Sequence, residues 1–198
     1  ENHLIAAVPD AELAPIVDDA LPALIFVDKE FEPLVGKVFE AATHRCKVIP
    51  FDPSAPDSGL SAWCADVPRS DPGLPADPNA IALLMHTSGT TGRAKGVQMT
   101  HQGLMYMRLC ESLEPTMQWR DEDVLLMVMP NFHLLGASLP IQSMYNGSTV
   151  SIMPLFEPGK LLGLIQSTRP TILVLAPTVI QMMLDHLSAK DTDFSSVR

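Results

Sequence analysis

Short apolar runs alternate with stretches of helical spacing over the second half of the chain, and this alternation restricts the fold more than any other feature of the sequence. Each apolar run has the length of a strand, and the stretches between the runs place apolar residues three or four positions apart. The predicted strands are 81–86, 124–129, 149–153 and 171–175, and the predicted helices are 103–113, one within 134–145, 160–168 and 179–188. Apolar strands separated by helices are typical of a mainly parallel sheet that helices cover on both faces. We therefore predict an α/β fold.

The first half of the chain has a shorter version of this pattern, followed by a segment without periodicity. Residues 24–28 and 47–51 read as strands, with helical spacing over 31–46 between them. From residue 52 to residue 79 prolines interrupt any helix or ladder, because proline lacks the backbone N–H that both require. The interrupting prolines are Pro53, Pro56, Pro68, Pro72, Pro75 and Pro78. We interpret this segment as a long surface connection.

These patterns predict three parts within one incomplete domain. The predicted parts are a strand-helix-strand lead-in over 1–51, a proline-rich connection over 52–79 and an α/β segment over 80–198. Of the 198 residues, 46% are hydrophobic and 18% are charged, which is typical of a globular chain and not of a disordered tail. The last eight residues are polar and follow a predicted helix that should lead into another strand, so we expect a truncated end.

The net charge and the cysteines restrict which kinds of partner this chain could bind and in which cellular compartment we expect it. The formal net charge of −10 argues against nucleic acid or an anionic membrane surface as a partner. Cys46, Cys64 and Cys110 are odd in number and widely spaced, which indicates neither a disulfide framework nor a zinc site and favours a reducing cytoplasm. No segment reaches the roughly 20 apolar residues that span a bilayer, so no integral membrane segment is predicted.

The stretch 84–97, Leu-Met-His-Thr-Ser-Gly-Thr-Thr-Gly-Arg-Ala-Lys-Gly-Val, is the most informative for chemistry. Its glycines allow positive φ and expose N–H groups, its hydroxyls add donors, and its lysine offers a mobile positive charge to phosphate oxygens. The window 78–110 contains Arg93, Lys95 and Arg108 and no acid, so it is positive in an acidic chain. The residues predicted to bind ATP phosphates are Thr87, Ser88, Gly89, Thr90, Thr91, Gly92, Arg93, Lys95 and Gly96.

Two other interpretations of this loop are weaker. A P-loop nucleotide hydrolase needs Gly-Lys-Ser/Thr in succession, but here Ala94 precedes Lys95 and Gly96 follows it. The tight glycine and the magnesium-binding hydroxyl are therefore both missing. Short Gly/Thr strings are also common as polar turns. The preceding strand and the lysine favour a phosphate loop over a plain turn.

The full string resembles the phosphate-loop signature of the adenylate-forming superfamily, which includes acyl-CoA synthetases, peptide-synthetase adenylation domains and luciferases. The resemblance implies part of the large N-terminal domain of an acyl-CoA synthetase-like fold. It also implies that the loop holds the β- and γ-phosphates of ATP while a carboxylate attacks the α-phosphate, after which coenzyme A displaces AMP. Ala94 stands where the family usually has proline, and His86 stands where an aromatic residue is common. Neither departure removes a phosphate-binding group.

Two later segments also resemble the family. Residues 100–104, Thr-His-Gln-Gly-Leu, resemble the start of the helix after the loop, where we interpret His101 as a cap or spacer. Residues 129–136, Met-Pro-Asn-Phe-His-Leu-Leu-Gly, resemble a second signature, Pro-x-Phe-His-x-x-Gly, whose aromatic residue and histidine line the carboxylate-substrate pocket. The resemblance implies an acyl-substrate pocket formed by Phe132, His133 and Gly136, with Gly136 supplying open volume beside the backbone.

Other segments that the family needs do not occur in this sequence: those that bind adenine, ribose and magnesium, the hinge, and the lysine of a C-terminal lid. The resemblance implies that they belong to missing N- and C-terminal parts of a parent chain. We therefore expect no complete catalytic site and no metal site in this fragment, and no adenylation by the fragment alone.

For the parent protein we expect a cytoplasmic ATP-dependent carboxylate–CoA ligase. The resemblance implies ATP, Mg²⁺ and coenzyme A as co-substrates, and a small carboxylic acid, for which a fatty acid is the preferred hypothesis. Two alternatives remain open. One is a catalytically inert fold that binds nucleotide or protein, and the other is an amino-acid-activating adenylation domain, which the His133 signature and the absence of a peptide-carrier segment disfavour.

Overall fold

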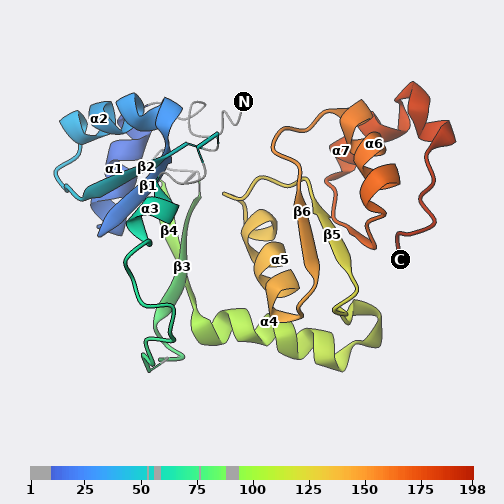
Figure 1. Ribbon diagram of the computed structural model, residues 1–198, viewed down its shortest axis with the longest axis horizontal. Coiled ribbons are helices and arrows are strands. Elements are labelled where there is room, and N and C mark those ends of the chain that lie inside the picture. The colour runs from blue at the N-terminus through green and yellow to red at the C-terminus, as the bar shows by residue number, and fades with distance from the viewer. Residues whose placement is uncertain (1–9, 53, 56–58, 76, 88–93) are drawn as a thin grey trace. The chain divides into compact units, whose positions relative to one another are not determined.

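The computed structural model describes residues 10–52, 54–55, 59–75, 77–87 and 94–198. The chain divides into two compact units between Met99 and Thr100. The N-terminal unit holds two pairs of strands with their helices, and the C-terminal unit holds a three-stranded sheet with its helices (Figure 1).

The N-terminal unit begins with a helix followed by a strand-helix-strand motif. Its elements are α1 (Asp10–Ala20), β1 (Leu24–Asp28), the 3-10 turn η1 (Lys29–Phe31), α2 (Glu32–Ala41) and β2 (Lys47–Phe51). β1 and β2 are parallel, with Leu24 opposite Lys47. α1 packs on α2 through a small core of Ala14, Val38 and Ala42. The predicted strands are confirmed, whereas the helix predicted over 31–46 ends at Ala41.

A carboxylate joins α1 to the loop after α2. Asp18 accepts hydrogen bonds from the backbone N–H of Thr43 at 2.8 and 3.1 Å and from that of His44 at 2.7 Å. The ring of His44 makes a further contact in the other direction: its Nε2 lies 2.8 Å from the carbonyl oxygen of Pro22, just after α1. The loop is therefore anchored to the last turns of α1.

The connection after β2 contains a short helix that the sequence analysis missed. α3 (Leu60–Trp63) follows Gly59, whose φ is 59° and whose Cβ position would lie 2.4 Å from Cβ of Phe51. Only glycine fits this turn, so the chain can fold back on β2 there. The prediction that prolines exclude all helix between 52 and 79 was wrong for this one turn, which contains no proline. The rings of Trp63 and Phe26 form a T-shaped contact with their centroids 5.8 Å apart.

The N-terminal unit ends with two paired strands, β3 (Ile81–Thr87) and β4 (Lys95–Thr100). β3 was predicted to within one residue. β4 was not predicted, because Lys95 and Gly96 are disfavoured in strands and Gln98 interrupts the apolar residues, and its strand form depends on its pairing with β3.

In the C-terminal unit, β5 (Val124–Met127) lies between β6 (Thr149–Ile152) and β7 (Ile172–Leu173), and both pairings are parallel. The surrounding helices are α4 (His101–Leu113), α5 (Leu134–Tyr145), α6 (Pro158–Thr168) and α7 (Pro177–Leu184), with 3-10 turns η2 (Pro115–Met117) and η3 (Leu187–Asp191). Strand, helix and strand thus follow one another as predicted, although β7 is shorter than the predicted 171–175. The helix predicted over 179–188 is split into α7 and η3.

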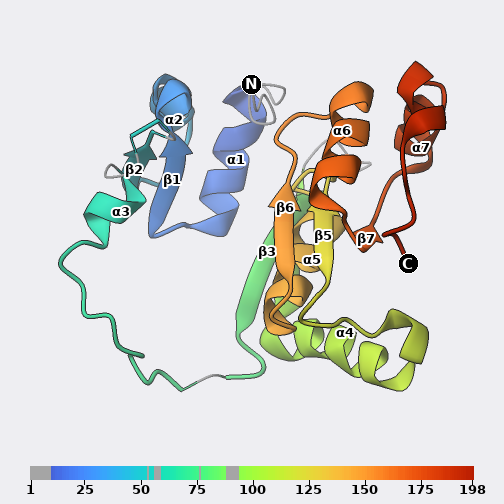
Figure 2. The same cartoon turned by 45° about the vertical axis from the view of Figure 1, so that its right-hand side comes forward.

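Alternate residues of β5 are buried on opposite faces of the sheet. Leu125 and Met127 pack with Leu139 of α5, whereas Leu126 packs with Leu161 of α6. Figure 2 shows α5 and α6 on opposite sides of the sheet. A strand covered on both faces must be apolar throughout, which explains the continuous apolar run of β5. The prediction of a parallel sheet between helix layers is confirmed, but the described strands form three small sheets.

Candidate functional site

The predicted phosphate loop joins the paired strands β3 and β4. Thr87 is the last residue of β3, and Lys95 and Gly96 are the first residues of β4. Thr87 and Lys95 are both exposed, so their polar groups are accessible to a ligand. The other predicted phosphate-binding residues lie outside the described residues: Ser88, Gly89, Thr90, Thr91, Gly92 and Arg93. The assignment of all nine residues to phosphate binding stays a prediction.

A histidine and an aspartate meet beside the ends of this loop. Nε2 of His86, which precedes Thr87 in β3, lies 2.9 Å from Oδ2 of Asp19 in the last turn of α1. The His86 side chain is 11% exposed and that of Asp19 is 60% exposed. The sequence analysis did not identify Asp19, because the two residues are 67 positions apart and no local pattern links them.

Gly96 packs directly against this pair. A Cβ at this position would lie 3.0 Å from Oδ2 of Asp19 and 3.3 Å from Nε2 of His86. It would also lie 3.1 Å from Cδ1 of Leu84. A side chain at position 96 would therefore fit only if these neighbouring side chains moved by a few tenths of an ångström, and this close contact is separate from the predicted contact of Gly96 with phosphate.

The helix after β4 begins with a side-chain cap. Oγ1 of Thr100 accepts a hydrogen bond of 3.1 Å from the N–H of Gly103. The cap is therefore Thr100, and His101 is the first helical residue. This satisfies one of the free N–H groups at the start of α4.

The second predicted motif lies at the start of α5 in the C-terminal unit. Phe132 is 52% exposed, and its ring centroid lies 4.3 Å from that of His133 with the two planes tilted by 43°. His133 is exposed and immediately precedes α5. Phe132 thus offers an exposed apolar ring beside the accessible imidazole of His133, and an acyl pocket could use both groups. Their role toward a substrate stays a prediction.

Gly136 has a structural reason to be glycine. It is buried, and a Cβ there would lie 1.9 Å from the carbonyl oxygen of Pro130. The N–H of His133 donates a 3.0 Å hydrogen bond to the same oxygen. The first turn of α5 thus closes tightly on the segment before Phe132.

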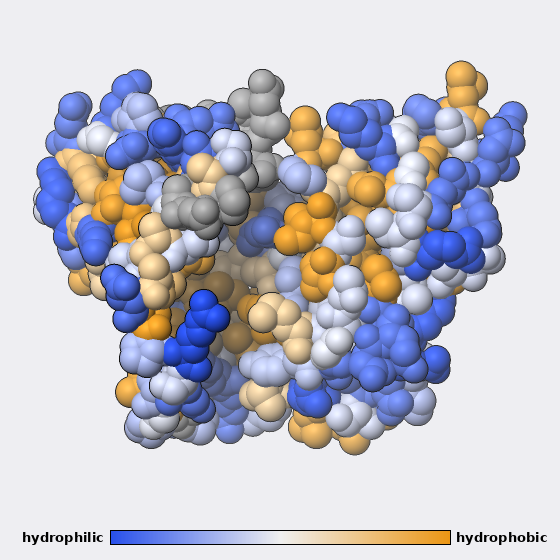
Figure 3. All heavy atoms as spheres, in the orientation of Figure 1, coloured by the Kyte–Doolittle hydropathy of each residue, from blue (hydrophilic) through white to orange (hydrophobic). Residues whose placement is uncertain are grey.

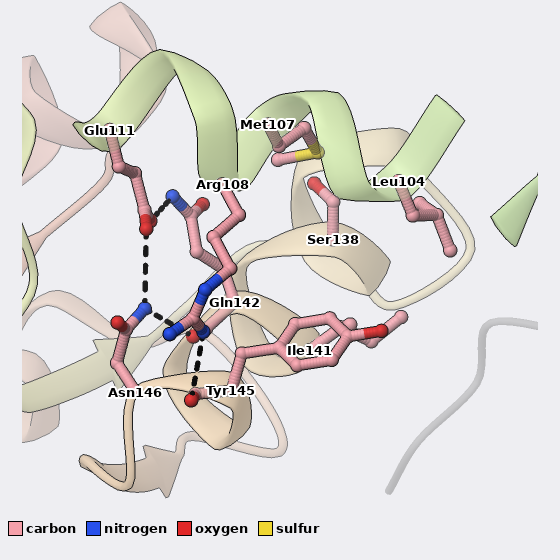
Figure 4. Close-up of a pocket in the computed structure, with 9 residues that line it drawn as sticks. All are labelled: Leu104, Met107, Arg108, Glu111, Ser138, Ile141, Gln142, Tyr145 and Asn146. Atoms are coloured by element: carbon pink, nitrogen blue, oxygen red, sulfur yellow. Dashed lines mark hydrogen bonds between the residues drawn. The ribbon is translucent and has the colours of Figure 1, made fainter. Parts of the chain in front are cut away.

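A polar cluster joins α4 to α5 (Figure 4). Glu111, only 4% exposed, accepts hydrogen bonds from Nε2 of Gln142 and, at 3.3 Å, from Nδ2 of Asn146. Arg108 donates through Nη1 to the carbonyl oxygen of Tyr145 at 3.0 Å. Burial raises the pKa of Glu111, although the hydrogen bond from Asn146 and the charge of Arg108 act in the opposite direction.

The cavity beside this cluster is small. Its volume is about 10 Å³, and Ser138, whose buried hydroxyl has no hydrogen-bond partner in the described structure, is one of its lining residues. Such a volume holds about one water molecule. The cavity cannot hold a nucleotide or an acyl chain.

A larger open hollow of about 500 Å³ lies between the end of β6 and α6. It is lined by Met153, Pro154, Leu155, Lys160, Gly163 and Leu164. Apolar side chains gather around the end of β6 on the face shown in Figure 3, and Ile152 and Leu155 are about half exposed. None of the predicted site residues lines this hollow.

The described residues contain neither a membrane-spanning helix nor a cluster of metal ligands. No described helix combines the length and apolar character needed to cross a membrane. No group of three or more His, Cys, Asp or Glu side chains in the described part of the chain could hold a metal ion.

Comparison with known proteins finds carboxylic acid ligases among the relatives of this chain. The chain is 30% identical over 191 residues to the fatty acid–[acyl-carrier-protein] ligase ScoC of Streptomyces coeruleorubidus, a match that covers 94% of this chain and 35% of that protein. It is 28% identical over 188 residues to the indoleacetate–CoA ligase of Aromatoleum aromaticum, covering 92% of this chain and 36% of that protein. The chain thus spans about a third of the length of these relatives.

A solved structure shares the fold. The chain superimposes on the inhibitor-bound N-terminal domain of FACL13 from Mycobacterium tuberculosis with a TM-score of 0.80 at 24% identity, covering 96% of this chain and 47% of that one. The AMP-binding enzyme family matches residues 3–198, which is nearly the whole sequence. This chain therefore belongs to the AMP-binding enzyme family.

Proposed function

We propose that this chain is the phosphate-binding and acyl-binding part of an ATP-dependent carboxylate–CoA ligase. The observation that carries the proposal is the position of Thr87 and Lys95, exposed at the two strand ends that flank the Gly/Thr-rich loop. An exposed hydroxyl and an ammonium group at the two ends of one loop suit the oxygens of a polyphosphate. Membership of the family and the ligase relatives support this reading.

The proposed reaction has two steps. A carboxylate oxygen of the acid attacks the α-phosphorus of ATP, the bond to the bridging oxygen breaks, and pyrophosphate leaves with acyl-AMP remaining. The deprotonated sulfur of coenzyme A then attacks the acyl carbonyl carbon, and AMP leaves with the electron pair of the broken bond. In this scheme Lys95 stabilises the charge that develops on the departing pyrophosphate.

Magnesium enters the proposed reaction with ATP, because Mg²⁺ commonly binds through substrate phosphates with only one or two carboxylates. We propose that the residues still needed for adenine, ribose and Mg²⁺ lie in other parts of the protein, so that this fragment alone does not adenylate. We place the protein in the cytoplasm, in agreement with its three unpaired cysteines.

For the acid we propose a fatty acid. The relative that matches 94% of the chain is named as a fatty acid ligase, while the indoleacetate ligase shows that aromatic acids occur among the relatives. The exposed ring of Phe132 is compatible with an apolar acyl chain. The identity of the acid therefore has to be tested with a panel of substrates.

The test is thioester formation by the full-length protein with ATP and Mg²⁺. Fatty acids of several lengths, indoleacetate, 4-coumarate and amino acids are each supplied with either coenzyme A or a phosphopantetheinylated carrier protein. We expect an acyl-CoA product, and its formation should be most efficient with a fatty acid. Product with an amino acid only would support an amino-acid-activating domain, and transfer only to the carrier protein would exclude coenzyme A as the thiol.

A further inference from the structure

The contact between Asp19 and His86 touches both ends of the phosphate loop. On one side, His86 is covalently next to Thr87, the last residue of β3. On the other side, the carboxylate and the ring lie so close to Gly96 that a Cβ there would be 3.0 and 3.3 Å from their polar atoms. Because Gly96 is next to Lys95, the pair lies beside both described strand ends of the loop.

Stabilisation of the fold alone does not explain this contact well. The Asp19 side chain is 60% exposed, and exposed ion pairs contribute little to stability because water screens them. The neighbouring Asp18 already anchors the same turn of α1 through bonds to the backbone of Thr43 and His44. The feature that distinguishes Asp19 from Asp18 is its partner, which belongs to the strand that leads into the loop.

We propose that Asp19 and His86 are positioning residues for the ATP phosphates. By the hydrogen bond between them, they fix the ring of His86 against Gly96 and so hold Thr87 and Lys95 at the separation that the phosphate oxygens require. Neither residue touches the ligand in this scheme. The inference rests on the proposed function, because it takes the loop between β3 and β4 to bind ATP.

In this scheme the hydrogen bond between Asp19 and His86 positions the loop, and the charge of the two side chains matters less. Asp19→Ala and His86→Ala each remove one partner, whereas Asp19→Asn keeps an acceptor oxygen and His86→Gln keeps an amide donor. Asp18→Ala is the matched control, since it removes an aspartate from the same turn without touching His86.

The experiment measures the Kd of ATP for the full-length protein by calorimetry, together with the KM values of ATP and of the acid. We expect Asp19→Ala and His86→Ala to weaken ATP binding by about tenfold and to leave the KM of the acid unchanged. The double variant should be no weaker than either single variant, because both remove the same interaction. Asp19→Asn and His86→Gln should recover most of the affinity, and Asp18→Ala should bind ATP like the wild type.

Other results would overturn the inference. It fails if both alanine variants bind ATP within about twofold of the wild type, or if Asp18→Ala weakens binding equally, which would indicate a general effect on α1. If the wild type binds ATP but forms no product with any acid, the proposed function fails while the positioning role is still decided by the Kd values. A wild-type protein that does not bind ATP at all would overturn both.

Discussion

Arg198 donates two hydrogen bonds to the carboxylate of Asp123, from Nε to Oδ1 over 3.0 Å and from Nη2 to Oδ2 over 2.5 Å. Asp123 is only 3% exposed and also accepts bonds of 2.7 Å from Oγ1 of Thr171 and from the N–H of Arg120. One carboxylate thus joins the residues that lead into β5 and β7 to Arg198. This arrangement makes the stability of the sheet depend on the ionisation of Asp123.

The first prediction concerns acid stability. Burial alone would raise the pKa of Asp123, but the hydrogen bonds from Arg198, Thr171 and Arg120 outweigh it and lower the pKa from 3.8 to about 2. The folded pKa is lower than the unfolded one, so this stabilisation is complete above about pH 4 and is lost as the pH falls toward 2. Its size is about 2 kcal/mol.

Urea unfolding of the wild type and of Asp123→Asn at pH 6 and at pH 3 checks this. The wild type should have the larger free energy of unfolding at pH 6, and the difference should shrink at pH 3. A difference of the same size at both pH values would show that the ionised carboxylate is not the source.

The second prediction concerns Glu111, whose pKa is shifted in the opposite direction. Because its folded pKa is raised, the folded protein binds more protons than the unfolded chain between the two pKa values, and stability falls as the pH rises through that range. Glu111→Gln removes the buried charge and keeps one acceptor oxygen, which can accept from Gln142, while Nδ2 of Asn146 still donates to the carbonyl oxygen of Gln142 at 3.0 Å. Its melting temperature at pH 7 should equal or exceed that of the wild type.

Glu111→Leu is the contrasting variant, since it leaves the amides of Gln142 and Asn146 without their partner. We expect a loss of about 1–3 kcal/mol in the free energy of unfolding. A large loss in Glu111→Gln as well would show that the ionised form of Glu111 is needed in the fold.

The third prediction uses two glycines in helices of the C-terminal unit. Gly136→Ala would place a Cβ 1.9 Å from a carbonyl oxygen, so we expect a loss of about 2–4 kcal/mol as the backbone shifts. Gly163, in α6, is exposed and has no atom within 4 Å of its Cβ position. Gly163→Ala should therefore stabilise the protein by about 0.5–1 kcal/mol. Thermal unfolding of both variants measures the contrast, and equal effects would contradict the packing of α5 on Pro130.

The fourth prediction concerns Lys95. If its ammonium group binds phosphate oxygens, Lys95→Ala loses one charge-assisted contact, about 2–3 kcal/mol or some 30- to 150-fold in kcat/KM for ATP. Lys160 is 72% exposed and pairs only at 3.7 Å with Glu157, so Lys160→Ala is a control of equal charge change. Steady-state kinetics with varied ATP separates the two, and an unchanged kcat/KM in Lys95→Ala would remove Lys95 from the site.

The sequence predicts those parts of the fold for which the pattern of residues within a single helix or strand is sufficient. β5 is apolar throughout because both faces are covered, and α5 was placed within 134–145, which are its bounds in the structure. The phosphate loop and the Phe132–His133 motif are also visible in the sequence, because their residues are contiguous. The ligand contacts of both motifs stay predictions.

The rest depends on contacts between distant residues. β4 has no strong strand pattern and exists through its pairing with β3. Asp19 is an ordinary helix residue until α1 brings it to His86, and the tight contact of Gly136 with Pro130 appears only once the turn closes. In each case the sequence identifies a residue type but not the neighbour that gives it a role.

The central claim is that this chain carries the phosphate loop of an enzyme that adenylates a carboxylic acid. Acid-dependent exchange of labelled pyrophosphate into ATP by the full-length protein tests it most directly, because exchange requires reversible formation of acyl-AMP. We expect exchange with at least one fatty acid, none without acid, and a strongly reduced rate in Lys95→Ala. No exchange with any acid by a folded full-length protein that binds ATP would contradict the claim and favour a fold that binds nucleotide without catalysis.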